Sequence, residues 1–138
     1  MFRRFTLLSI VAISSCVLAQ VPSSVSSVET YRIGDILVRL IIHNMEINPV
    51  IEVDTINRSD YEINDVFRVS SISLDNEKLD FNQSAGVFVE EYGVRDNKVF
   101  FVLDYFYLHG GGSVLVDCEV SFEKEKILPP ECRVMKVN

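Results

Sequence analysis

One ten-residue segment, residues 99–108, is apolar on both sides when it is read as a β-strand. Alternate side chains of a strand point to opposite faces of a sheet. The odd-numbered side carries Val99, Phe101, Leu103, Tyr105 and Tyr107. The even-numbered side carries Phe100, Val102, Asp104, Phe106 and Leu108. In a two-layer sandwich only one face of this strand meets the core. The other must be covered by a loop, by a second copy of the chain or by a partner.

Of the two sides, the odd-numbered one is expected to be the binding surface, through Phe101, Tyr105 and Tyr107. A tyrosine packs its ring while its hydroxyl stays hydrated, which enriches this residue at protein interfaces. His109, directly after the strand, is assigned to the same surface. Coverage of one side by the chain itself is the simpler explanation of the two-sided pattern, and it stays open beside an intermolecular interface.

The rest of the chain is patterned as short strands. Residues 113–123 alternate, with Val114, Val116 and Cys118 on a core side and Asp117 and Glu119 on a wet side. Turn signals such as Asp75-Asn76 and Asp96-Asn97 recur about every ten residues, as in a sandwich or barrel. We therefore expect an all-β fold: a single-domain antiparallel β-sandwich of about seven or eight strands, immunoglobulin-like in general form. Strand order is left open.

The expected strands are residues 35–44, 50–56, 66–74, 79–81, 86–92, 98–108 and 113–123, with a closing strand through Val137. A helix over residues 35–46 is an open alternative, because Ile36, Leu37, Leu40 and Ile41 also fit a helical period. The many β-branched residues of this run favour the strand.

The N-terminus has the pattern of an export signal. Arg3 and Arg4 precede an apolar run of about 15 residues, too short to span a bilayer, and Val17-Leu18-Ala19 suits a signal peptidase. We expect a signal peptide over residues 1–19, a flexible leader over 20–30 and the β domain over 31–138, in a secreted or periplasmic protein. The alternative is a lipoprotein: residues 13–16, Ile-Ser-Ser-Cys, resemble a bacterial lipobox, which would place a lipid on Cys16.

Two cysteines, Cys118 and Cys132, remain in the folded part after either processing. A pair of cysteines in an exported chain predicts a disulfide. The closed loop of about 15 residues would stabilise the fold by about 3 kcal/mol. Two cysteines are too few for a structural zinc site, and His43 and His109 lack ligand spacing, so no metal is expected.

The chain is acidic. Loss of Arg3 and Arg4 changes the formal net charge from −7 to −9, and the other basic residues are scattered among acids. Such a surface repels phosphate backbones, so nucleic-acid binding is not expected. An acidic surface suits solubility or a basic protein partner.

Other motifs carry little chemistry. The segment His109-Gly-Gly-Gly resembles the glycine-rich oxyanion-hole segment of lipases and esterases, but the chain has no Gly-x-Ser-x-Gly nucleophile motif, and a wide hairpin loop accounts for the glycines. Asn57 and Asn82 begin Asn-x-Ser sequons, which matter only in a eukaryotic source. No catalytic residues and no cofactor are expected.

The sequence thus favours a non-enzymatic, exported protein-binding domain, such as an inhibitor or an immunity-type factor, that uses the aromatic strand. Two alternatives remain. One is a structural surface domain that is held by a lipid on Cys16 or that binds a second copy of itself. The other is a β-barrel that binds a small molecule among the aromatic residues.

Overall fold

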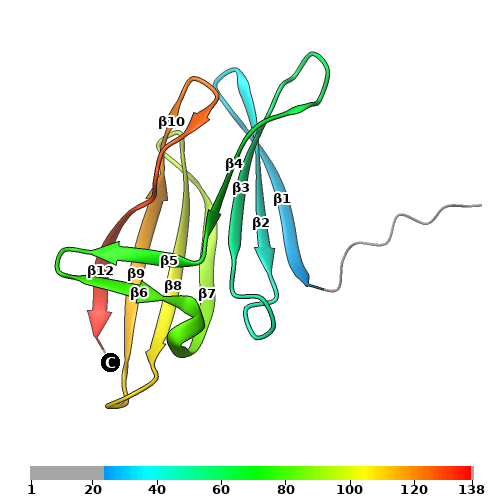
Figure 1. Cartoon of the computed structure of the whole chain (residues 1–138). Coiled ribbons are helices and arrows are strands. Elements are labelled where there is room, and N and C mark those ends of the chain that lie inside the picture. The colour runs from blue at the N-terminus through cyan, green and yellow to red at the C-terminus, as the bar shows by residue number, and fades with distance from the viewer. Residues whose placement is uncertain (1–23, 138) are drawn as a thin grey trace, which may run out of the picture.

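The computed structural model describes residues 24–137, and side chains as far as residue 135. About 69% of this part is β-strand, arranged as two four-stranded antiparallel sheets and two short hairpins (Figure 1). The expected fold class, an antiparallel β-sandwich, is confirmed. In the described part no helix is long and apolar enough to cross a membrane.

The first sheet consists of four strands in chain order: β1 (Val25–Ile33), β2 (Ile36–His43), β3 (Ile51–Ile56) and β4 (Ile63–Val69). Residues 35–46 therefore form a strand and a loop rather than the alternative helix. Residues 25–30, expected in a flexible leader, belong to the edge strand β1. Val38 and Leu40 of β2 pair with Thr55 and Val53 of β3 on the core side.

The second sheet has the order β12-β9-β8-β7. Its strands are β7 (Ser84–Arg95), β8 (Lys98–Tyr107), β9 (Ser113–Val120) and β12 (Glu131–Val137). Asp96 and Asn97, the predicted turn, both have positive φ and join β7 to β8 in a two-residue turn. Gly110, Gly111 and Gly112 also have positive φ in the β8–β9 loop, which confirms the predicted hairpin role of these glycines.

The first sheet is a meander of sequential strands, and in the second sheet β7, β8 and β9 are sequential while β12 joins β9 after the β10–β11 hairpin. This order differs from the Greek-key connections of immunoglobulin domains. Two hairpins interrupt the sequence. They are β5 (Ser71–Leu74) with β6 (Glu77–Asp80), and β10 (Phe122–Glu123) with β11 (Lys126–Ile127). A single 3₁₀ turn, η1 (Phe81–Gln83), leads into β7. The two sheets stay separate in the described part, so the barrel of the small-molecule alternative is not formed.

The hydrophobic core is one cluster that draws on both sheets and both hairpins. Leu40 and Val53 contribute from the first sheet, Phe101 and Val116 from the second, and Ile72 and Leu79 from the β5–β6 hairpin. The predicted disulfide, Cys118–Cys132, is present and joins residues directly opposite each other on β9 and β12. It therefore ties the edge strand β12 to the sheet.

Candidate functional site

The odd-numbered side of β8, expected to bind a partner, faces the core. Phe101 is 0% exposed and Tyr105 is 4% exposed. The β5–β6 hairpin lies against this side: the hydroxyl of Tyr105 donates to the carbonyl oxygen of Asp80 (3.0 Å), and that of Tyr107 to Glu77 Oε2 (3.4 Å). The chain thus covers this side itself. The side of β8 that can meet a partner is the even-numbered one.

Strand β7 borders the open part of this outer face. It is an edge strand, hydrogen-bonded only to β8 among the strands described. Its other flank faces the first sheet, where the hydroxyls of Ser27 on β1 and Tyr92 on β7 lie 2.9 Å apart. Beyond this contact, toward η1, the strand separates from the first sheet and borders two adjoining hollows.

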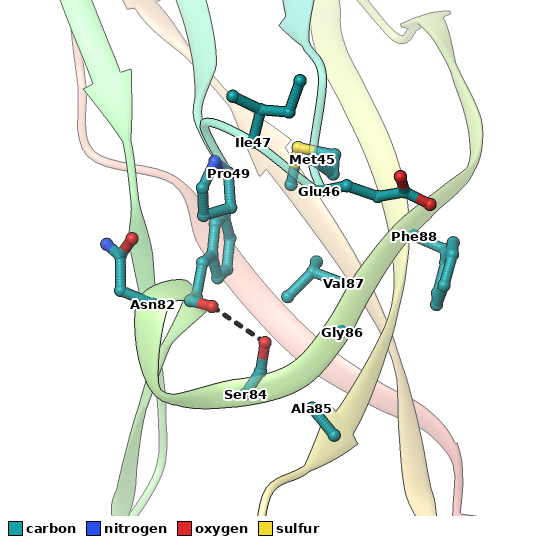
Figure 2. A pocket seen from close by; sticks show the side chains of 11 residues that line it. Met45, Glu46, Ile47, Pro49, Asn82, Ser84, Ala85, Gly86, Val87 and Phe88 are labelled. Carbon is teal, nitrogen blue, oxygen red and sulfur yellow. Dashed lines mark hydrogen bonds between the residues drawn. The ribbon is translucent and has the colours of Figure 1, made fainter.

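These hollows form what we call the β7 groove, in which Met45 and Glu46 of the β2–β3 loop lie across from Val87 and Phe88 of β7. The two parts have volumes of about 390 and 530 Å³. Figure 2 shows Val87 turned toward Met45, and Phe88 on the opposite side of the strand. Buried Val87 supplies an apolar floor, and Ile47, 73% exposed, stands on the rim.

Phe88 also belongs to an aromatic patch on the outer face of the second sheet. We define this outer patch as Phe88, Asp104 and Phe106. The two phenylalanine rings meet edge to face with centroids 5.6 Å apart, and they are 48% and 37% exposed. Asp104 is the cross-strand neighbour of Phe88 and lies two residues from Phe106 on the same side of β8.

The opposite end of the same outer face carries a charged network around Asp117. This face of β9 was predicted to be wet, which is wrong for Asp117, because its side chain is only 1% exposed. Arg95 and Arg133 lie over it and donate to its oxygens at 2.9 and 2.7 Å. Burial raises the pKa of Asp117, but these hydrogen bonds outweigh burial and hold the pKa below its ordinary value.

The outer face of the first sheet has a second buried carboxylate, Asp54, which is bonded to Arg39. Glu52, beside it on β3, pairs with Arg68 at 2.7 Å. Burial raises the pKa of Asp54, nearby Glu52 raises it further, and Arg39 lowers it without reversing the shift. The two sheets therefore bury aspartates whose pKa values move in opposite directions.

Asp117→Asn and Asp54→Asn are expected to differ in their pH dependence. A lowered pKa means that ionised Asp117 stabilises the fold above the ordinary value of 3.8, and this contribution is lost as pH falls below it. A raised pKa means that the contribution of Asp54 is complete at low pH and is lost as pH rises above 3.8.

Asp117→Asn should therefore lower the free energy of unfolding most near pH 7, by about 1.5–3 kcal/mol. Asp54→Asn should lower it most in acid. Urea unfolding from pH 2.5 to 7 measures both, and parallel profiles for the two variants would contradict the assignment.

Of the remaining predicted residues, Asn82 lines the groove, and none belongs to the outer patch. His109 is exposed in the glycine loop. Asn57, in the β3–β4 loop, accepts hydrogen bonds from the backbone N–H and hydroxyl of Ser59, while Asn82 is exposed on η1 at the edge of the groove. Among residues 24–135 no three His, Cys, Asp or Glu side chains are grouped to hold a metal ion. Cys16 and the predicted signal peptide over residues 1–19 lie outside the described residues.

Phe88 was not among the predicted binding residues, whereas Phe101 and Tyr105, which were, are buried in the core. One signal could have corrected the choice. A five-residue β8–β9 loop sets Phe101 opposite Cys118, and Cys118 was already assigned to the core. Residues that pair directly across a hairpin share a face, so the odd-numbered side of β8 had to be internal. No such signal was available for the β7 groove, which depends on where the β2–β3 loop lies.

No protein-family model, curated protein or solved structure matches the chain.

Proposed function

We propose that this chain is an exported, non-enzymatic protein-binding domain that binds an extended segment of another protein along β7. The main support is a group of exposed apolar side chains beside β7, whose second edge pairs with no other described strand: Ile47 and Phe88 line the groove, and Phe106 packs on Phe88. Monomeric proteins seldom expose a continuous apolar patch of this kind without using it. Export is inferred from the N-terminal pattern and agrees with the disulfide.

An extended partner segment suits this place for physical reasons. An edge strand presents unpaired backbone N–H and C=O groups, which a second strand can satisfy, while alternate side chains enter neighbouring hollows. The β7 groove supplies such a hollow beside the strand. Exposed Glu90 and Glu91 disfavour pairing of β7 with the same strand of a second copy, because like charges would then face each other. A foreign segment of basic character is therefore favoured over self-association.

Site-specific photocrosslinking in the native host tests this proposal. A benzophenone amino acid would replace Ile47 or Phe88, with Tyr61 as the matched control. Ile47 and Tyr61 are both 73% exposed, but they lie on loops at opposite ends of the first sheet (Figure 1). We expect the same light-dependent adduct from positions 47 and 88 and none from 61.

The purified adduct partner would then be titrated with variants. Phe88→Ala should weaken binding at least tenfold, whereas Tyr61→Ala should change it less than twofold. The absence of adducts at positions 47 and 88, or an equal yield of adducts at position 61, would contradict the proposed function.

A further inference from the structure

We propose that Asp104 in the outer patch receives a cationic side chain, an arginine or a lysine, from the bound partner. This inference rests on the proposed function and adds the chemistry of the partner. Asp104 Oδ1 is buried and has no hydrogen-bond partner among the residues whose side chains the structure describes. Buried carboxylate oxygens are normally paired, because removing them from water without a partner costs free energy. Asp104 is also absent from the ion pairs of the described part.

The surroundings of this carboxylate favour a cation over a neutral donor. Phe88 lies across from Asp104 on β7, and Phe106 lies two residues along β8. Aromatic rings attract cations, and a carboxylate between partly exposed rings adds a full negative charge in a partly desolvated place. The net charge of −7 for the whole chain further favours a basic partner.

The other end of the same face contains a complete version of this arrangement. There the guanidinium of Arg95 lies 4.5 Å from the ring centroid of Phe100 and donates to Asp117 and Glu119, each at 2.9 Å. One sheet thus combines a phenylalanine on β8, carboxylates beside it on β9 and an arginine that lies over the ring. The outer patch repeats the phenylalanine and the carboxylate, and in the described part no arginine lies over it. A partner arginine would complete the arrangement.

The test uses a defined probe, the blocked peptide acetyl-Val-Thr-Arg-Thr-Val-amide. Its control replaces arginine with citrulline, which has nearly the same shape without the charge. Binding would be followed by ¹⁵N chemical-shift changes in the exported protein. We expect changes at residues 86–90 and 102–108 with the arginine peptide. With citrulline, or in Asp104→Asn, the affinity should fall about tenfold or more.

One variant separates this site from a general acidic field. Glu62→Gln removes the same charge from an exposed position in the β3–β4 loop, away from the groove and the outer patch, and should leave binding within twofold. A second variant, Lys136→Gln, tests whether a lysine of the chain itself already pairs with Asp104, because the backbone of Lys136 lies opposite Leu115, which is itself opposite Asp104. Binding to this variant should stay within twofold. Tighter binding to Lys136→Gln, equal binding of the citrulline peptide, or equal losses in Asp104→Asn and Glu62→Gln would overturn the inference.

Failure of this inference is distinguishable from failure of the proposed function. Adducts at position 88 that persist unchanged in Asp104→Asn would overturn the cation site and leave strand binding at β7 in place. Absence of any adduct at positions 47 and 88 would overturn the proposed function, and with it the partner's cation.

Discussion

Phe101→Ala is expected to lower the free energy of unfolding by about 3–5 kcal/mol, the usual cost of emptying the space of a fully buried phenylalanine. Phe101 is 0% exposed and belongs to the core, and its cross-strand partners are Tyr92 on β7 and Cys118 on β9. For a domain of this size such a loss is a large part of a total of about 5–15 kcal/mol. Equilibrium urea unfolding would measure it.

The matched control is Phe106→Ala, five residues along the same strand on the other face. Phe106 is 37% exposed and its main aromatic contact is Phe88, so we expect a loss of about 1 kcal/mol. Phe101→Leu gives a milder change if the alanine variant fails to fold. A larger loss for Phe106→Ala than for Phe101→Ala would mean that the even-numbered side of β8 is the internal one, and it would remove the outer patch.

Local patterns were sufficient to predict the class of fold. Alternation along β9 identified the core side of Val114, Val116 and Cys118, and all three are buried. Turn residues were equally informative, because Asp96 and Asn97 tolerate the positive φ that a tight hairpin turn requires. These signals act between residues near each other in the chain, so a sequence can display them directly.

What the sequence could not predict depends on contacts between distant segments. Asp117 was expected in solvent, yet Arg95 and Arg133 cover it from positions 22 and 16 residues away. Tyr105 was expected on a binding surface, yet the β5–β6 hairpin folds back over it. A strand that is apolar on both sides indicates that both of its faces must be shielded from water. Which side the chain covers, and which it leaves for a partner, follows from the path of loops that have no periodic pattern.

The double variant Cys118→Ala with Cys132→Ala is expected to lower the free energy of unfolding by about 3 kcal/mol. The bond links residues 14 apart, and closing a loop of about 15 residues restricts the unfolded chain by roughly that amount. The folded chain should change little elsewhere, because β12 keeps its backbone pairing with β9. Urea unfolding of the variant, beside wild-type protein with and without reductant, would measure the loss.

The comparison with reduced wild-type protein separates the bond from the side chains. Reduction breaks the link and leaves both sulfur atoms in place, whereas the double variant also leaves a small void at buried Cys118. Similar losses in the two would therefore assign the stabilisation to the link. A loss below about 1 kcal/mol in both would mean that pairing of β12 with β9 already restricts the segment, so that the disulfide adds little. Binding at the β7 groove should survive reduction wherever the fold does, because β7 lies at the opposite edge of the sheet from β12.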